Sequence, residues 1–115
     1  MGAIYTDLTE PGVAIVVLEG EHELFGATKL QRKLEALIDD GLALVIDLTC
    51  TTFLDSSIVS VLLRAGERAR HGGTRYAIVL DESTGDSVRR TFAMTGLDRY
   101  LPVVPSRAAA LLRAS

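Results

Sequence analysis

The stretch Leu42–Arg70, LALVIDLTCTTFLDSSIVSVLLRAGERAR, decides how the rest of the chain folds. It begins with an unbroken apolar run, residues 42–48, which is too short for an ordinary helix and lacks the alternation of a strand with one wet face. After a short polar connection, Asp55, Ser56 and Ser57 directly precede a segment whose apolar residues recur at helical spacing. The pattern predicts a central strand buried on both faces, a loop, and a helix whose first turn carries two hydroxyls.

The two sides of this helix can be read from its sequence, because successive residues of an α-helix lie about 100° apart. The side expected to face the core holds Ile58, Val61, Leu62, Ala65 and Ala69. The opposite side holds Ser56, Ser60, Arg64 and Glu67. Ser56 is therefore expected to point to solvent.

Asp55 is expected to cap this helix, since its carboxylate can accept hydrogen bonds from the free amides of the first turn. On this interpretation Ser56 and Ser57 need be no more than tolerated first-turn residues. A functional role for them requires support from a wider pattern.

The N-terminal third of the chain predicts a hairpin and a crossover. Residues 4–8 and 13–18 are strand-like and flank the turn signal Pro11-Gly12. A helix that starts at Gly26 and ends at residues 39–41 then leads into the Leu42 strand. Because a strand, a helix and a strand follow one another, we expect the two strands to be parallel.

The segment after the central helix predicts one more buried strand and one more helix. Residues 71–73, His-Gly-Gly, are a helix stop. Residues 76–80 are apolar enough for a buried strand, and residues 87–95 predict a helix that turns either Met94 or Leu97 inward.

The C-terminal end predicts a short edge strand and a last helix. Pro102-Val103-Val104-Pro105 can supply only an edge strand, because proline donates no ladder hydrogen bond. Ser106 is expected to cap a helix in which Ala109 and Leu112 pack inward, with Ala108 as a further candidate.

Composition and charge describe one ordinary globular domain. A chain of 115 residues, 48% hydrophobic and 23% charged, can fill a single core. The net charge is −3 and the Lys and Arg residues are spread along the chain, so the sequence shows no basic patch of the kind that binds nucleic acid. The sequence shows no signal-peptide pattern and no apolar run near the roughly 18 residues of a membrane span, so we expect a cytoplasmic protein without membrane contact.

Candidate catalytic groups are few. The motifs of phosphate cradles, dinucleotide sites, nucleophile elbows, zinc proteases and C-x-x-C sites are all missing from the sequence. A hydrolase would need a base beside its serine, and the two histidines, His22 and His71, fall in a loop after a strand and at a helix stop. Cys50 is interpreted as a small loop residue rather than a nucleophile. A single cysteine is also typical of a protein in a reducing compartment. We therefore expect no catalytic residue, no metal and no cofactor.

Several runs resemble the signature of STAS domains and, within them, of the bacterial anti-sigma-factor antagonists. The runs are Val45-Ile46-Asp47-Leu48, Thr52-Phe53-Leu54-Asp55-Ser56-Ser57, Leu18-Glu19-Gly20-Glu21-His22-Glu23, Gly72-Gly73 and Phe92-Ala93-Met94-Thr95-Gly96-Leu97. They occur in the family's order over nearly the whole chain, and the Asp-Ser-Ser step is the most specific. The resemblance implies an α/β fold: a STAS-like single domain over residues 1–115, with a mixed, mostly parallel sheet of four to five strands, about four helices and an N-terminal hairpin.

The resemblance also implies a function. In the family, the unphosphorylated antagonist binds an anti-sigma factor that is itself a serine kinase, which releases a sigma factor, and the kinase then phosphorylates the antagonist and ends the interaction. Carried over by motif position, Ser56 is the phosphoacceptor, and Asp55 and Ser57 shape the helix entrance. Glu23 stands where the family has an acid close to that serine, although it could equally be a solvated loop residue. The ATP would be bound by the partner kinase. Asp47 matches a family acid interpreted as structural.

Physical chemistry favours Ser56 as a switch. A phosphate in the first helical turn would lie near free amides and the positive end of the helix dipole, so the fold could hold it unchanged. It would add about −1.5 to −2 charges at neutral pH. Burying a poorly paired dianion in an interface costs several kcal/mol, and about 1.4 kcal/mol is a tenfold change in affinity. One phosphate could therefore dissociate a complex.

The helical wheel places Leu63 near the Ser56 side, with Val59 at its flank. A single exposed leucine is unremarkable by itself. Our hypothesis is that these two side chains form the apolar centre of the partner contact. The predicted partner-binding residues are Glu23, Asp55, Ser56, Ser57, Val59, Ser60, Leu63 and Arg64.

One position departs from the family pattern, since many members have glycine where this chain has Ile58. Two alternatives to the switch stay open. The first is a STAS interaction module that works without phosphorylation, as a scaffold or transport-complex subunit. The second is a small-molecule or nucleotide binder, or an enzyme. The sequence leaves the oligomeric state open.

Overall fold

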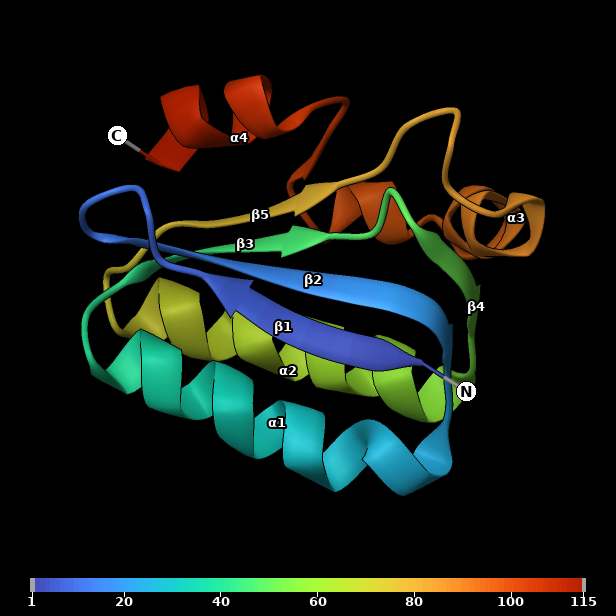
Figure 1. Ribbon diagram of the computed structural model, residues 1–115, viewed down its shortest axis with the longest axis horizontal. Coiled ribbons are helices and arrows are strands. Elements are labelled where there is room, and N and C mark those ends of the chain that lie inside the picture. The colour runs from blue at the N-terminus through green and yellow to red at the C-terminus, as the bar shows by residue number, and fades with distance from the viewer. Residues whose placement is uncertain (1, 115) are drawn as a thin grey trace.

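A mixed sheet runs through the middle of the protein, with α1 and α2 on one face and α4 on the other (Figure 1). The computed structural model describes residues 2–114, and within this range the sheet has six strands in the order β1-β2-β3-β5-β6, with β4 paired to β2 off this path. The strands are β1 (Ala3–Asp7), β2 (Val13–His22), β3 (Ala43–Asp47), β4 (Thr51–Leu54), β5 (Tyr76–Val79) and β6 (Val103–Val104). The helices are α1 (Leu24–Asp39), α2 (Ser56–His71), α3 (Asp86–Thr95), the short 3-10 helix η1 (Leu97–Arg99) and α4 (Arg107–Ala114).

The hairpin and the parallel centre of the sheet confirm the prediction. β1 and β2 pair antiparallel around a turn in which Gly12 has a φ of 75°, a conformation that costs glycine little. β2 pairs in parallel with β3, and β3 with β5. All residues of β3 are buried, as expected of a central strand covered on both faces.

The polar connection predicted after β3 contains a strand, which raises the expected four to five strands to six within the described residues. β4 pairs in parallel with the end of β2, residues 20–22. Its threonines and phenylalanine suit an extended backbone, and Thr51 Oγ1 donates to the carbonyl oxygen of Leu18 at 2.6 Å. The strand was missed because four residues with only their ends buried carry too little periodicity to recognise.

The predicted faces of the central helices are confirmed. The buried residues of α2 are Ile58, Val61, Leu62, Ala65 and Ala69. The helix ends before Gly72, and Gly73 has the positive φ that its stop requires. Near α3, Leu97 is the inward residue, whereas Met94 is exposed.

The sheet separates two apolar clusters. The larger one lies on the side of α1 and α2, where side chains such as Val16 and Ile46 are fully buried. The smaller one lies on the opposite face, where α4 packs over Val45 and Val79. Within residues 2–114, no helix combines the length and hydropathy that a membrane span requires.

α4 is held to the sheet by an ion pair. Arg107 Nε donates to Oδ2 of the buried Asp47 at 2.6 Å, and the other carboxylate oxygen of Asp47 accepts from the amide of Thr49 at 2.9 Å. The contact is consistent with the structural role interpreted for Asp47.

The inward face of α4 differs from the prediction. Ser106 caps the helix as expected, with its hydroxyl accepting from the amide of Ala109 at 3.1 Å. However, Ala110 and Leu111 pack on the sheet, and Leu112 is exposed. The ion pair at the start of α4 helps set the rotation of the helix about its axis. A short run of alanine and leucine residues does not predict this long-range contact.

Candidate functional site

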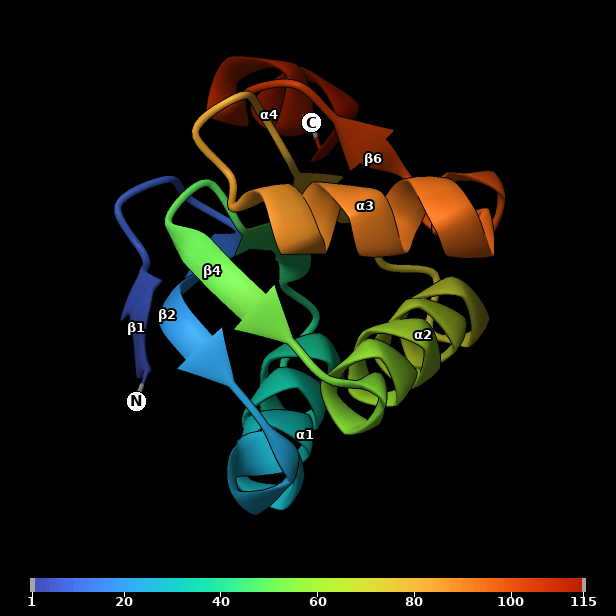
Figure 2. The same ribbon diagram turned by 90° about the vertical axis from the view of Figure 1, so that its right-hand side faces the viewer.

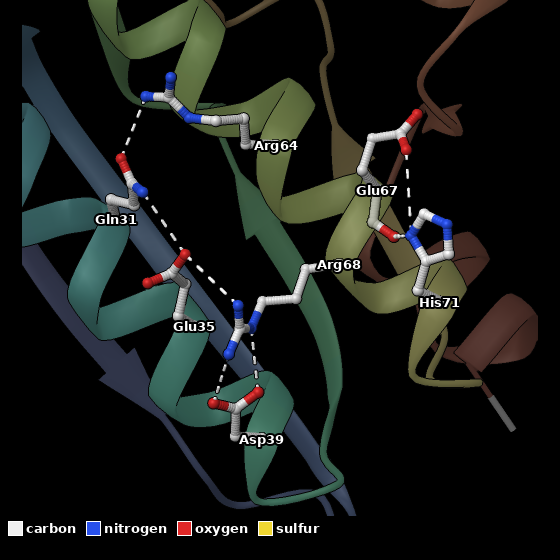
Figure 3. A network of polar contacts seen from close by, with 7 residues as sticks. All are labelled: Gln31, Glu35, Asp39, Arg64, Glu67, Arg68 and His71. Carbon is white, nitrogen blue, oxygen red and sulfur yellow. Dashed lines mark hydrogen bonds and ion pairs between the residues drawn. The ribbon is translucent and has the colours of Figure 1, made fainter.

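α1 and α2 lie side by side with their first turns at the same end of the molecule (Figure 2). Across their interface Arg64 donates to Gln31 at 3.0 Å, and four residues later Arg68 binds Asp39 through two hydrogen bonds of 3.0 and 2.8 Å (Figure 3). The residue numbers rise together along both helices, so the helices run parallel. Because α1 follows β2 and α2 follows β4, their first turns meet where these paired strands end.

Asp55 joins the two first turns. Its Oδ1 accepts from the amides of Ser57 and Ile58 at 3.1 and 3.2 Å, which confirms the predicted cap on α2. Its Oδ2 accepts from the amide of Leu24, the first residue of α1, at 2.9 Å. This second cap supports the start of α1 at Leu24 rather than at Gly26, and it links residues too distant in sequence for a local pattern to reveal.

The hydrogen bonds to Asp55 hold the pKa of its carboxyl below the usual value. The Ser57 hydroxyl, 2.5 Å from Oδ1, has the largest effect. Partial desolvation opposes it, and the amides of Ile58, Leu24 and Ser57 lower the pKa further. The carboxylate is therefore ionised at neutral pH and remains an acceptor for both helix ends.

The two serines have different environments. The Ser57 hydroxyl donates to Asp55 and its side chain is half-buried. Ser56 is exposed, as predicted, and its hydroxyl makes no hydrogen bond with any other residue in the range 2–114. Ser56 is therefore the serine of this pair whose hydroxyl another protein can reach.

The first-turn amides of α2 are largely occupied, contrary to the expectation that they would be free to hold a phosphate. The amides of Ser57 and Ile58 donate to the Asp55 carboxylate, and that of Val59 donates to the Asp55 carbonyl oxygen at 3.1 Å. A group added to Ser56 would thus stand in solvent beside an ionised carboxylate.

Glu23 lies at the same end of the molecule as the first turn of α2. The amide of Asp55 donates to the carbonyl of His22 at 3.2 Å, and the Asp55 carboxylate accepts from Leu24. Glu23 is held between these two contacts. Its side chain is exposed and makes no capping hydrogen bond.

The middle of α2 is less open than the helical wheel suggested. Val59 and Leu63 are half-buried and pack against the main core, so they are only partly available to a partner. Ser60 is exposed, whereas Arg64 reaches across to α1. A wheel treats a helix as if it lay alone on the sheet and cannot show what neighbouring elements cover.

Apolar side chains missed in the sequence lie at the Ser56 end instead. In the first turn of α1, Phe25 is 99% exposed and Leu24 is 66% exposed. Phe53, at 38% exposed, precedes Asp55 by two residues on β4. The signal available beforehand was the helical spacing, which places Phe25 on the opposite side of the helix from the buried stripe Ala27, Leu30, Leu34 and Ile38.

Ile58 points into the core and is fully buried. Its bulk is therefore directed away from the exposed side of α2 on which Ser56 lies. The departure from glycine at this position adds apolar packing beneath the site and leaves its surface open.

Each of the two histidine rings lies within hydrogen-bond distance of a carbonyl of its own strand or helix. His22 is buried with Nε2 2.9 Å from the carbonyl of Glu19, and His71 Nδ1 lies 2.9 Å from the carbonyl of Glu67. Cys50 is exposed between β3 and β4. Among the described residues, no three His, Cys, Asp or Glu side chains are grouped to hold a metal ion.

The sequence of the chain matches a known family. The model of the STAS domain matches residues 6–110. The anti-sigma-F factor antagonist RsfB of Mycobacterium tuberculosis is 32% identical over 89 residues, which cover 76% of this chain and 70% of that relative. The chain is a STAS domain of the anti-sigma-factor antagonist family.

Solved structures agree with this membership. This STAS domain aligns with the crystal structure of an anti-sigma factor antagonist from Mycobacterium paratuberculosis at a TM-score of 0.85 and 29% identity, covering 99% of this chain and 94% of the other. SpoIIAA in its unphosphorylated form shares the fold, at a TM-score of 0.75, 19% identity and coverage of 94% and 93%. The phosphorylated form of the Bacillus SpoIIAA aligns at 0.69, with 18% identity and coverage of 94% and 96%.

Proposed function

We propose that this STAS protein is an anti-sigma-factor antagonist switched by phosphorylation. In the cytoplasm its unphosphorylated form binds a serine-kinase anti-sigma factor and so releases a sigma factor. The kinase supplies bound ATP and phosphorylates Ser56, which ends the interaction. The chain is thus a binding protein and a substrate rather than an enzyme. The observation that carries the proposal is the exposed Ser56 hydroxyl, unbonded within the described residues, on a turn that Asp55 holds in place.

The surroundings of Ser56 explain how a phosphate would act without unfolding the protein. Asp55 already caps both helices, so the phosphate is not needed for their stability and does not compete for their amides. It would add about −1.5 to −2 charges next to an ionised Asp55 and close to Glu23. Docking a partner over this site would desolvate several like charges at once, at a cost of several kcal/mol.

The proposed docking surface combines the first turns of α1 and α2. Phe25 and Leu24 supply most of its exposed apolar area, and Ser56 and Ser60 supply a polar rim. Aromatic side chains, including Phe, are enriched in protein interfaces relative to the rest of the surface. Phosphorylation of Ser56 would place a hydrated dianion on the same docking surface as Phe25 and so oppose burial of this surface by a partner.

Relatives support the proposal. SpoIIAA, which shares this fold, has a phosphorylated form, and RsfB is named as an antagonist of the anti-sigma-F factor. The names of these two relatives agree with the proposal that this chain binds an anti-sigma factor and is phosphorylated on an exposed serine.

The test is incubation with candidate anti-sigma-factor kinases and ATP, followed by intact mass measurement. We expect the mass of one phosphate on the natural protein and on Ser57→Ala, and none on Ser56→Ala. Gel filtration before and after ATP addition should show the complex dissociating. A phosphate that persists on Ser56→Ala would remove Ser56 from this role. A complex that survives full phosphorylation would favour the scaffold alternative.

A further inference from the structure

A hollow lies along the C-terminal half of α2, beginning at Leu63. It is an open groove of about 1180 Å³, walled by α2, η1, the start of β6 and the end of α4. The buried side chains of Tyr76, Leu97 and Leu101 contribute to its lining. Its volume lies above the range of about 300–1,000 Å³ typical of small-molecule pockets, so the groove suits a longer ligand.

The groove is positively charged, although the protein as a whole carries a net charge of −3. Four arginines line it against two carboxylates, a local excess of two positive charges. These residues are Arg64, Arg70, Arg99 and Arg113, with Glu67 and Asp98. Such a patch attracts anions that the rest of the surface repels.

Only one of these guanidiniums is paired with a carboxylate within residues 2–114. Arg70 binds Glu67 at 3.1 Å. Arg64 donates to an uncharged side-chain amide of α1. The side chains of Arg99 and Arg113 donate to no acceptor in this range. The guanidiniums of Arg99 and Arg113 are thus available to carboxylates, which arginine binds well because its donors form a planar fork.

The arginines are spread along the groove rather than gathered at one point. Arg64 and Arg70 are six residues apart on α2, which corresponds to about 9 Å along the helix axis. One small anion cannot reach both. An extended peptide advances about 3.3 Å per residue, so acidic side chains on alternate residues would recur about every 6.6 Å. At the edge of the groove Tyr100 is 76% exposed and offers an aromatic contact to such a chain.

We propose that this groove binds an extended acidic segment of a protein partner. Leu63 and Arg64 belong both to the groove and to the α2 face that begins at Ser56, so one partner can occupy both surfaces. The groove itself needs neither a kinase nor a phosphate on Ser56, and it therefore extends the interaction surface beyond the switch.

The test is an NMR titration of the ¹⁵N-labelled natural protein with a synthetic peptide of alternating Glu and Ser. A peptide in which Gln replaces Glu is the first control, and inorganic pyrophosphate is the probe for small anions. We expect the acidic peptide to shift the amide resonances of Gly66, Thr74, Arg99, Tyr100 and Val103, which line or adjoin the groove. The effect should weaken at high salt, since the Debye length shortens.

Two double variants with the same change in net charge locate the binding. The first replaces Arg99→Glu and Arg113→Glu in the groove, and the second replaces Arg32→Glu and Arg90→Glu outside it. All four side chains are exposed, so both variants should fold. We expect the first to weaken peptide binding by at least about tenfold and the second to keep it.

Four outcomes would overturn the proposal. They are equal losses in both double variants, shifts scattered outside the groove, no shifts at all, and tighter binding of pyrophosphate at the same resonances, which would indicate a small-anion site. None of them bears on whether Ser56 is phosphorylated, so failure of this proposal is distinguishable from failure of the switch.

Discussion

Replacement of Phe25 by serine separates partner binding from folding. The ring is 99% exposed, so the free protein loses almost no packing, and the free energy of unfolding should change by no more than about 0.5 kcal/mol. If the ring is buried in the complex, the loss of apolar burial amounts to about 1.5–3 kcal/mol. At about 1.4 kcal/mol per factor of ten, affinity should fall by about 10-fold to 150-fold.

The assay is isothermal titration of the unphosphorylated protein with its anti-sigma-factor kinase, accompanied by urea denaturation of each variant. Leu8→Ser is the matched control, because Leu8 is also exposed but lies in the turn between β1 and β2. That turn is at the opposite end of β2 from α1. The control should bind as the natural protein does.

Undiminished binding by Phe25→Ser would refute the reasoning, because it would show that the kinase does not cover the first turn of α1. Equal weakening by both replacements would refute it as well, since the effect would then follow loss of any exposed apolar side chain. A large loss of stability in Phe25→Ser would contradict the exposed position of the ring.

Two further replacements test the support beneath the site. Leu62→Ala removes most of a fully buried side chain of α2. Urea denaturation should show a free energy of unfolding that is lower by about 2–5 kcal/mol. A change below about 1 kcal/mol would contradict the close packing of α2 on the sheet. Asp55→Asn tests the carboxylate. The pKa of this carboxyl is lower in the folded protein than the ordinary 3.8. The ionised carboxylate therefore contributes fully to stability above pH 3.8, and this contribution is lost as the pH falls through the lowered pKa of the folded state. The melting temperature of the natural protein should therefore fall more steeply below about pH 4 than that of the variant, and parallel curves would argue against an ionised cap.

Local sequence patterns predicted much of the fold, because interactions between residues close in sequence determine the buried face of a helix and its N-terminal cap. The buried side of α2 could be predicted because its apolar residues recur with the 3.6-residue repeat of a helix and so form a single apolar face, which packs on the core. The cap by Asp55 followed from the unpaired amides that begin every helix. Predictions were weaker where the signal was short, as in β4 and in the rotation of α4.

The sequence by itself determined that an outward-facing serine begins a capped, amphipathic helix after a buried strand. Only the tertiary structure decided what surrounds that serine. The parallel pairing of β2 with β4 brings the first turns of α1 and α2 together, so that one carboxylate of Asp55 caps both and Phe25 lies at the Ser56 end. The arginine groove likewise draws on residues from Leu63 to Arg113. Periodicity records which face of an element is buried, whereas the contacts between elements depend on strand pairing across long separations in the chain, which no local pattern encodes.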